Sequence, residues 1–445
     1  MNSRFIFFTA KRRFRSVLWR ATDALFIAIL LALILHILVH VSVATSPLLA
    51  QALVPYKWYG VNRSGGEFSP EKIPGIPGTD FVYPDNADLM RTFTERGLIL
   101  LRLPFIWERL QPEALGPLDP ETVRQIKKTL DSAKDAKAQV LLDLHNYGRY
   151  HKKALIASDG KLLGDVWSKL LLEVQNHPAL FGAEIMNEPH DLVGGPDTWK
   201  QIAQDTVTIM RERGVSTRLV IPGYGWQSAR YWQDNNAGLT IADPDENMVY
   251  SAHQYFDKSG TGIYDEVELS MLLPGKAGEL LKPFTDWLEK NKATGIITEF
   301  GVPKTDMAWL PVLDEFLTVV DTNPRLLGAV YWSSGPWWGD YPLSVEPDNS
   351  PQTVSILKVL SQFPSRSNPV TLPKFVKPGQ TVKFKNQPTI YLVDKNGLLP
   401  FATWSGYKAY RATHANSRLV MLLDKAENYT IRWVEAELGF ISNFR

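Results

Sequence analysis

Short apolar runs alternate with amphipathic segments along most of the chain. Between residues 56 and 363, eight apolar runs follow one another roughly 30–45 residues apart, with helical patterns between them. The runs cover residues 58–62, 98–103, 140–144, 183–186, 218–221, 248–252, 295–298 and 328–332. Eight strand–helix units in about 300 residues are typical of a (β/α)8 barrel, whereas a doubly wound open sheet gives no reason for eight. The pattern therefore predicts an α/β fold with a (β/α)8 TIM barrel at residues 56–363.

The amphipathic segments carry start and stop signals for helices. Asp119 followed by Pro120 predicts an N-cap and a first-turn proline. Trp199 and Met210 belong to an apolar stripe in a segment that ends at Gly214, a residue that favours helix termination. These signals support helices between the predicted strands.

The N-terminus departs from this alternation. Residues 24–43 form an uncharged, mostly apolar run of about 20 residues, which is long enough for a helix to span a bilayer. Residues 1–23 are basic, and no charged residue follows the run until Lys57. This asymmetry predicts a cytoplasmic segment at 1–23, a transmembrane anchor or signal core at 24–43, and export of the rest of the chain. Cleavage of a signal peptide near Ala50-Gln51-Ala52 is the alternative, and it would leave the protein secreted.

The pattern changes again near residue 364. Residues 364–369 are rich in Pro and Ser, which predicts a linker. Residues 370–445 contain short alternating runs at 381–384, 389–393 and 429–434, with turn residues between them. This second region therefore predicts a small β-rich accessory module.

Composition narrows the possible chemistry. The chain has 445 residues, 44% of them hydrophobic and 21% charged, and its net charge is +1. A charge so near zero does not indicate a nucleic-acid partner. The sequence contains no cysteine, which excludes disulfides, thiolate metal sites and a cysteine nucleophile. No spacing typical of a metal or nucleotide site is present, so we expect no cofactor and no metal.

Polar and aromatic residues stand at the carboxyl ends of the predicted strands, where (β/α)8 barrels hold their active sites. Each residue has an ordinary structural explanation when taken alone. Together they are hard to explain by packing, because buried polar side chains at one rim need partners or a ligand. The set consists of Arg102, His145, Asn146, Asn187, Glu188, His253, Tyr255, Glu299 and Trp332.

Two carboxylates give this set a specific chemistry. Glu188 follows an apolar run and precedes Pro189, which prevents the backbone from continuing as a central strand. Glu299 ends a second apolar run in the same way. A pair of carboxylates at one barrel rim suggests acid/base and nucleophilic catalysis on a glycosidic bond.

These motifs resemble those of family 5 glycoside hydrolases, the cellulase-type retaining (β/α)8 enzymes. Ile185-Met186-Asn187-Glu188-Pro189 is similar to the acid/base signature of the family, and Ile297-Thr298-Glu299-Phe300-Gly301 is similar to its nucleophile strand. The other shared positions of the family correspond to Arg102, His145, His253, Tyr255 and Trp332. The stretches at 60–62 and 252–257 resemble the endo-β-1,4-glucanase branch more than the mannanase branch.

The resemblance implies a role for each residue. Glu188 is expected to be the acid/base and Glu299 the nucleophile, with Arg102 and Tyr255 orienting Glu299. Asn187 is expected to bind the sugar 2-hydroxyl. His145 and His253 are expected to bond to sugar hydroxyls or neighbouring carboxylates. Asn146, from its place at the strand end, is a further candidate for binding or supporting the substrate. Trp332 would lie under the sugar that is cleaved. Flanking sugars would rest on Trp226, Trp337 and Trp338, although packing explains these three residues equally well.

The expected function is retaining, endo-acting hydrolysis of a β-1,4-glucan. The expected partners are a β-glucan polysaccharide or oligosaccharide and, if the N-terminal helix is retained, the membrane. A β-mannanase or β-1,3-glucanase on the same site stays open, and so does a non-catalytic membrane-tethered polysaccharide-binding protein. The sequence gives no indication of the oligomeric state.

Overall fold

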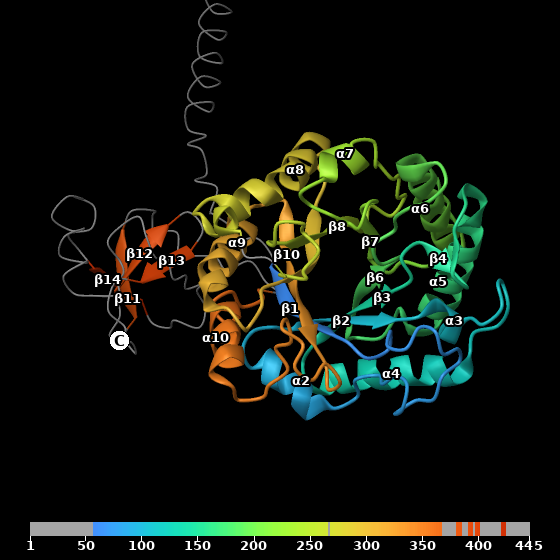
Figure 1. Cartoon of the computed structure of the whole chain (residues 1–445), viewed down its shortest axis with the longest axis horizontal. Coiled ribbons are helices and arrows are strands. Elements are labelled where there is room, and N and C mark those ends of the chain that lie inside the picture. Colours follow the sequence, from blue (N-terminus) through green and yellow to red (C-terminus); the bar gives the residue numbers. More distant parts are fainter. Residues whose placement is uncertain are drawn as a thin grey trace, which may run out of the picture. The chain divides into compact units, whose positions relative to one another are not determined.

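Eight parallel strands close into a barrel, and helices surround it (Figure 1). The computed structural model describes residues 57–265, 268–366, 380–384, 390–394, 397–400 and 420–423. The strand order around the barrel is β1-β10-β9-β8-β7-β6-β3-β2. The barrel strands are β1 (Trp58–Arg63), β2 (Leu100–Phe105), β3 (Gln139–Leu144), β6 (Leu180–Glu184), β7 (Leu219–Pro222), β8 (Met248–Tyr255), β9 (Gly295–Gly301) and β10 (Leu326–Ser334). Each predicted apolar run falls on one of these strands, so the predicted TIM barrel is confirmed.

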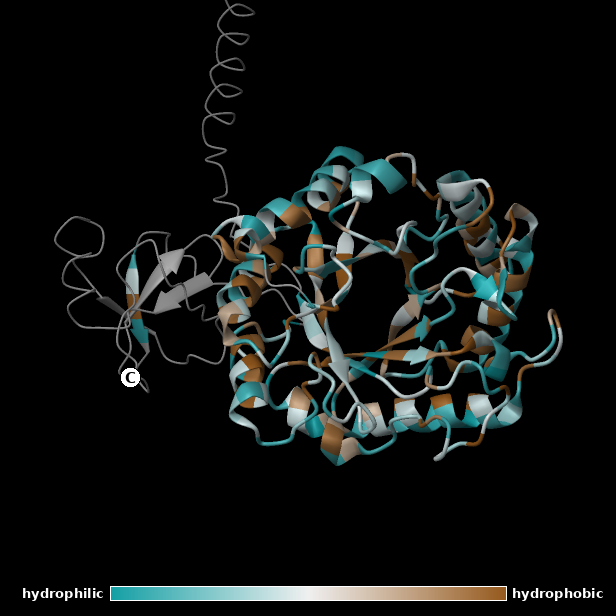
Figure 2. Cartoon of the chain, viewed as in Figure 1, coloured by the Kyte–Doolittle hydropathy of each residue, from teal (hydrophilic) through white to brown (hydrophobic). Residues whose placement is uncertain are grey.

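Helices connect the strands and cover the outside of the barrel. Asp119 accepts a hydrogen bond from the backbone N–H of Thr122, and Pro120 occupies the first turn of α4 (Pro120–Asp135), as the sequence predicts. Hydrophobic and hydrophilic residues alternate along the helices (Figure 2), and the buried apolar residues of these helices, such as Ile126 and Leu130, belong to the hydrophobic core. The helices are α2 (Ala87–Thr94), α3 (Trp107–Leu110), α4 (Pro120–Asp135), α5 (Gly160–Val174), α6 (Gly195–Glu212), α7 (Trp232–Asn236), α8 (Lys276–Asn291), α9 (Leu310–Thr322) and α10 (Pro351–Leu360).

The barrel interior has an apolar layer beneath a polar one. The apolar layer consists of Leu100, Leu141, Phe181, Val220, Val249, Ile296 and Val330, each from a different strand. Side chains alternate along a strand, so residues two positions later point the same way. In the next layer, toward the carboxyl ends, these positions hold Arg102, Asp143, Ser251 and Thr298, all fully buried. The apolar layer thus supports a polar layer at the end of the barrel where (β/α)8 enzymes hold their sites.

Strand β9 carries an irregularity that matters for the site. Against β8, Ala252 pairs with Ile297 and His253 pairs with Glu299, so Thr298 is an extra residue on β9. An extra residue of this kind is a β-bulge, which changes the direction of the side chains that follow. Thr298 and Glu299 are neighbours in sequence, and both make buried hydrogen bonds inside the barrel.

The amino end of β1 is tied to residues that follow α10. The backbone of Lys57 exchanges hydrogen bonds with that of Arg366, at 3.2 and 2.7 Å. The Arg366 guanidinium also forms an ion pair with Asp321 at 2.7 Å. The segment predicted as a linker at 364–369 therefore begins with residues that contact the barrel, and residues 367–369 lie outside the described part of the chain.

The described residues of the C-terminal region form a four-stranded sheet in the order β13-β12-β11-β14. Two of its strands fall on predicted runs, β11 (Thr381–Phe384) at 381–384 and β12 (Ile390–Asp394) at 389–393, and the predicted strand at 429–434 lies outside the described residues. The remaining strands are β13 (Gly397–Pro400) and β14 (Val420–Leu423), and a separate hairpin pairs β4 (Arg149–Tyr150) with β5 (Lys153–Ala154).

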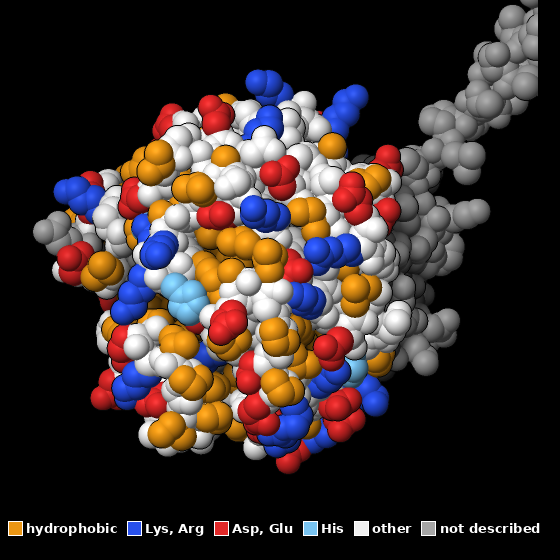
Figure 3. Space-filling model, turned by 90° about the vertical axis from the view of Figure 1, so that its right-hand side faces the viewer, with side chains coloured by type: hydrophobic (Ala, Val, Ile, Leu, Met, Phe, Trp, Pro, Cys, Tyr) orange, Lys and Arg blue, Asp and Glu red, His pale blue; other side chains and the backbone are white. Residues whose placement is uncertain are grey.

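The predicted segments at 1–23 and 24–43 also lie outside the described residues. Within the described part, no helix combines the length and apolar character that a bilayer crossing requires. On the outer face drawn in Figure 3, Lys and Arg side chains are interspersed with Asp and Glu. This face therefore shows no large area of a single charge, in agreement with the near-zero net charge of the chain.

Candidate active site

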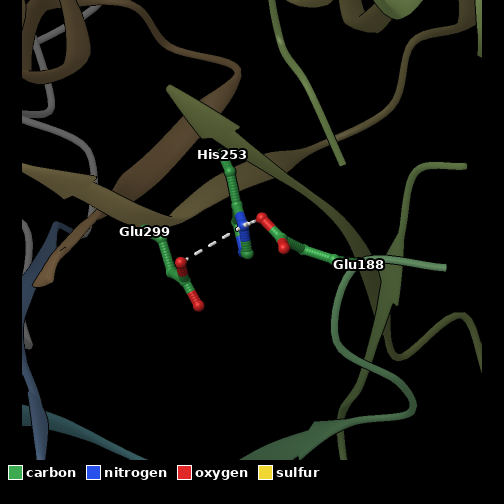
Figure 4. A group of neighbouring side chains, drawn as sticks. All are labelled: Glu188, His253 and Glu299. Carbon is green, nitrogen blue, oxygen red and sulfur yellow. Dashed lines mark hydrogen bonds and ion pairs between the residues drawn. The ribbon is translucent and has the colours of Figure 1, made fainter. Parts of the chain in front are cut away.

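Two glutamates approach each other across the carboxyl end of the barrel, with a histidine between them (Figure 4). Glu188 follows β6, Glu299 lies in β9 and His253 lies in β8. His253 Nδ1 is 2.8 Å from Glu188 Oε1 and 3.5 Å from Glu299 Oε2. One oxygen of each glutamate and one ring nitrogen all lie within 4.8 Å of one another. The Glu188 side chain is 16% exposed and the Glu299 side chain 6%, so both are within reach of a ligand while largely shielded from water.

The backbone at Glu188 is held in an unusual conformation. Its φ is 42°, in the left-handed region that residues with a Cβ rarely adopt. Its N–H donates to Gln227 Oε1 at 3.0 Å, and Gln227 itself has a φ of 58°. Strained residues of this kind cost about 1–3 kcal/mol each and persist where the surroundings fix them, often at functional sites. The strain here accompanies the placement of one carboxylate at the barrel mouth.

Glu299 is held by two strong donors. Arg102 Nη1 donates to its Oε1 at 2.7 Å, and the Tyr255 hydroxyl donates to its Oε2 at 2.9 Å. Both contacts favour the ionised carboxylate, since hydrogen bonds to a charged acceptor are stronger than neutral ones. Glu299 is therefore fixed in orientation and stabilised as an anion.

Arg102 organises the polar layer beneath the two glutamates. Its guanidinium is fully buried, and its five N–H groups match five acceptors at 2.6–3.0 Å. The acceptors are the carboxylates of Glu184, Asp143 and Glu299 and the amide oxygens of Asn62 and Asn187. Because Asn187 turns its oxygen toward Arg102, its NH2 group faces the other way, where it lies 3.4 Å from His145 Nε2 and keeps one hydrogen for a further partner.

The electrostatic surroundings act differently on the pKa values of the two glutamates. Burial and the charge of Glu299 raise the pKa of Glu188 well above its usual value. Burial also raises the pKa of Glu299, but Arg102 and the Tyr255 hydrogen bond act in the opposite direction. Two carboxylates this close resist ionising together. The shared proton therefore belongs on Glu188, and Glu299 carries the charge.

The neighbouring histidines are neutral. Burial, together with the Arg102 charge, lowers the pKa of His253 well below its usual value. The same causes lower the pKa of His145 to about 3. Burial raises the pKa of Asp143 to about 7, and Arg102 counteracts this. The only positive charge among these buried groups is thus Arg102.

His145 and Asn146 have different surroundings. His145 Nδ1 lies 2.7 Å from Asp143, and its Nε2 lies 3.1 Å from the Tyr147 hydroxyl. The Asn146 amide accepts from the backbone N–H of Trp107 and donates to Glu108, both at 2.8 Å. The structure thus joins His145 to the polar layer and uses the Asn146 side chain to hold the adjoining loop.

The predicted tryptophans divide into buried and exposed ones. Trp332 is 9% exposed and its ring stacks parallel to that of His145, with centroids 5.6 Å apart. Trp338 packs edge-on against Trp332 at 5.8 Å. Trp337 is 40% exposed and stacks on Phe68. The structure therefore brings Trp332 and Trp338 together and leaves Trp337 open at the surface.

Trp226 is half exposed at 51% and stacks on His190, with ring centroids only 3.5 Å apart. It immediately precedes Gln227, whose amide contacts Glu188. An exposed indole face supported from below by a second ring is a flat apolar surface of the kind on which a sugar can rest.

Sequence reasoning missed several residues that build the site. Asn62, Asp143, Glu184, Gln227 and Thr298 all belong to the buried hydrogen-bond network. All of these except Gln227 lie in strongly apolar runs. A polar residue at an inward position of such a run is unusual, and this feature of the sequence could have identified them. Gln227 lies in a loop and gave no such signal.

Glu188, His253 and Glu299 are also the one group among the described residues whose donor atoms lie close enough together to hold a metal ion. Two carboxylates joined through a neutral imidazole form an acid–base group equally well. A (β/α)8 barrel that presents such a pair at the carboxyl ends of its strands has the arrangement of a glycoside hydrolase.

Comparison with known proteins agrees with this class. Residues 61–336 match the family described as cellulase (glycosyl hydrolase family 5). The chain belongs to glycoside hydrolase family 5. It is 30% identical over 312 residues to a probable endo-β-1,4-glucanase B of Aspergillus oryzae, covering 69% of this chain and 90% of that protein.

Solved structures are similar as well. The Pseudomonas stutzeri endoglucanase Cel5A is 36% identical with a TM-score of 0.63, and the match covers 72% of this chain and 97% of that one. XacCel5A in complex with cellopentaose is 35% identical with a TM-score of 0.63, and the match covers 68% of this chain and 99% of that one.

Proposed function

We propose that this glycoside hydrolase is a retaining endo-β-1,4-glucanase in which Glu188 is the acid/base and Glu299 the nucleophile. The observation that carries the mechanism is the approach of the two carboxylates to within 4.8 Å. Retaining enzymes hold this pair about 5–5.5 Å apart, whereas inverting enzymes need about 6.5–9.5 Å to admit a water molecule. The substrate class is supported by the relatives, which are endo-β-1,4-glucanases, and by the cellopentaose bound to XacCel5A.

In the first step, ionised Glu299 attacks the anomeric carbon while Glu188 gives its proton to the glycosidic oxygen. The bond between that carbon and the leaving sugar oxygen breaks, and an ester between Glu299 and the remaining sugar forms. Arg102 and Tyr255 support this step because they keep Glu299 ionised and aimed. Trp332 provides the apolar surface at the rim beside them.

In the second step, Glu188 acts as the base. Formation of the ester removes the negative charge of Glu299, which was one cause of the raised pKa of Glu188. Glu188 can then take a proton from water, which attacks the anomeric carbon and releases Glu299. One residue therefore serves both half-reactions because its neighbour changes charge between them.

The remaining site residues bind the sugar. Asn187 commits its oxygen to Arg102 and so can donate from its NH2 group to the sugar 2-hydroxyl. Such a bond strengthens as positive charge develops on the ring in the transition state. Trp226 and Trp337 offer exposed aromatic faces for flanking sugars. The barrel would work outside the cytoplasm, as the charge asymmetry of the N-terminal segment indicates.

The test is hydrolysis by the full chain of carboxymethyl cellulose, mixed-linkage β-glucan, mannan and laminarin. We expect reducing ends from the first two substrates and an early β-anomer by proton NMR, and Glu299→Gln as the control should release none. Preferential cleavage of mannan or laminarin would show that the substrate is a mannan or a β-1,3-glucan and not a β-1,4-glucan. An α-anomer appearing first would exclude retention, and binding without hydrolysis would favour the non-catalytic alternative.

A further inference from the structure

Glu184 lies at the end of β6, fully buried, and contacts neither catalytic glutamate directly in the described hydrogen-bond network. All its partners are donors. Its Oε2 accepts from Arg102 Nε at 2.6 Å. Its Oε1 accepts from Gln227 Nε2 at 2.7 Å, from Thr298 Oγ1 at 2.8 Å and from the hydroxyl of Ser251. A carboxyl group that only accepts, and that is bonded to a guanidinium, is ionised.

The backbone of Glu188 fixes the orientation of the Gln227 amide. Its oxygen accepts the backbone N–H of Glu188 at 3.0 Å, so its NH2 group must face the other way. There it lies 2.7 Å from Glu184, 2.8 Å from Ser251 and 3.2 Å from Thr298. The two hydrogens of this NH2 group point toward the nearer acceptors, Glu184 and Ser251, and its nitrogen cannot accept, so the proton of Thr298 has to go elsewhere.

The Thr298 proton has two candidate acceptors. Glu184 Oε1 is nearer, at 2.8 Å, and is charged, whereas His253 Nε2 is 3.2 Å away and neutral. The proton therefore goes to Glu184, and the oxygen of Thr298 can only accept from the histidine. His253 Nε2 must then carry its hydrogen.

The direction of these hydrogen bonds also determines which atom donates between His253 and Glu188. A neutral His253 with hydrogen on Nε2 has a bare Nδ1, and Nδ1 lies 2.8 Å from Glu188 Oε1. A bare nitrogen and an ionised carboxylate both only accept, so the contact requires a proton on Glu188. The chain of hydrogen bonds thus runs from Glu188 through His253 and Thr298 to Glu184.

We propose that Glu184 is a positioning residue that, through Thr298 and His253, fixes the direction of the hydrogen bond from Glu188 and keeps the acid in its protonated form. The inference rests on the proposed role of Glu188 as the acid. Glu184 touches neither substrate nor the reacting atoms in this scheme. Its charge also raises the pKa of Glu188 directly, and because Thr298→Val keeps that charge, this variant isolates the effect of the His253 tautomer. The charged and titratable groups that face Glu188 are His253, Glu299, Arg102, Asp143, Glu184, Tyr147 and Tyr255.

Two substitutions break the chain at different points. In Glu184→Gln the one remaining oxygen stays with Arg102, so the new NH2 group faces Thr298 and frees its proton for His253 Nε2. The new group also meets the NH2 group of Gln227, a contact between two donors that Thr298→Val does not create. In Thr298→Val the link is removed without a change of charge. Both changes should place the hydrogen of His253 on Nδ1, where it stabilises ionised Glu188. The alkaline limb of kcat/KM should then move about one pH unit toward acid, a tenfold loss of activity on that side.

The direct measurement is a long-range proton–nitrogen NMR spectrum of the full chain labelled with ¹⁵N-histidine, with His253 assigned by comparison with His253→Gln. Wild type should show the Nε2–H tautomer, both variants the Nδ1–H tautomer, and Thr298→Ser the wild-type pattern. Ser251→Ala is the matched control, because it removes a hydroxyl from the same oxygen of Glu184 but makes no contact with His253. It should leave the tautomer and the alkaline limb unchanged.

An Nδ1–H tautomer in wild type would overturn the inference, and that result needs no variant to fold. So would variants with a native circular dichroism spectrum that keep the wild-type tautomer and pH profile. Failure of the proposed function has a different signature, because a wild-type protein that hydrolyses no glycan would still report the His253 tautomer.

Discussion

The surroundings of Glu188 and of Glu299 differ although the two side chains are chemically identical. Glu299 accepts from a guanidinium and a phenol, which are strong donors to an anion. Among the described residues, the side-chain partner of Glu188 is the ring of a neutral histidine. The environment therefore assigns the roles: one carboxylate is held as an anion and the other as an acid.

The difference between the two glutamates originates in one cation, Arg102. Arg102 uses one N–H group on Glu299, and the rest go to carboxylates and amides beneath the site. Removing one partner of a buried ion pair leaves an uncompensated charge, so every acid around Arg102 depends on the others. This arrangement explains why the site needs buried residues that never meet the sugar.

The largest expected effect comes from removing each carboxylate in turn. Glu299→Ala should lower turnover of β-glucan by more than about 10⁴-fold, because no ester can form. Glu188→Ala should cost about 10²–10⁴-fold, the usual contribution of a general acid. Initial rates on cellotetraose measure both losses. An aryl cellobioside has a leaving group that needs little protonation. If Glu188→Ala and Glu299→Ala lost equal activity on this substrate, the assignment of the two roles would be contradicted.

Added azide tests the two roles independently. In Glu299→Ala, azide fits the vacated space and attacks from the side of the missing nucleophile, which gives an α-glycosyl azide. In Glu188→Ala the ester on Glu299 still forms with an activated substrate, and azide opens it to a β-glycosyl azide. Product NMR distinguishes these outcomes. The same anomer from both variants would mean that the two carboxylates have been assigned wrongly.

A smaller effect is expected from Tyr255→Phe. The Tyr255 hydrogen bond lowers the pKa of Glu299, so its loss should raise that pKa. Activity requires ionised Glu299 and therefore rises as the pH increases through this pKa. The acid limb of kcat/KM should move toward higher pH by about one unit, since a hydrogen bond to a charged group contributes about 1.5–3 kcal/mol.

The same profile contains its own control. The alkaline limb reports deprotonation of Glu188, whose side chain bonds to His253 and not to Tyr255. It should stay where it is in wild type. A shift of both limbs, or of the alkaline limb alone, would show that Tyr255 does not act on Glu299 specifically.

The barrel and its two glutamates could be predicted from the sequence because both depend on local patterns. Each strand appears in the sequence as an apolar run, and Glu188 lies shortly after one of these strands and Glu299 near the end of another. The supporting residues depend on geometry that no local pattern encodes. Thr298 precedes Glu299, and a regular strand would turn these side chains to opposite faces. Only the bulge in β9 brings both inside.

Gln227 illustrates the same limit in a loop. It lies 39 residues from Glu188 in the sequence, and its amide reaches the backbone N–H of that residue only because the loop after β7 returns over the barrel mouth. Asn146 shows the limit next to a strand, since its position beside His145 did not indicate that its amide contacts the Trp107 backbone and Glu108. Proximity in sequence placed these residues at the rim but could not give the direction of their side chains.

The smallest expected effect comes from Trp226, a surface residue outside the pair of carboxylates, and it tests whether the surface acts on binding alone. Trp226→Ala removes an exposed ring that stacks on His190, and an aromatic contact of this kind contributes about 0.5–1.5 kcal/mol. KM for cellopentaose should rise about 3–10-fold while kcat and both pH limbs stay unchanged. Leu115→Ala, at the same 51% exposure but in the loop before α4, is the matched control and should change none of these values. A loss of kcat in Trp226→Ala would indicate instead that this ring positions Gln227, and through it the backbone of Glu188.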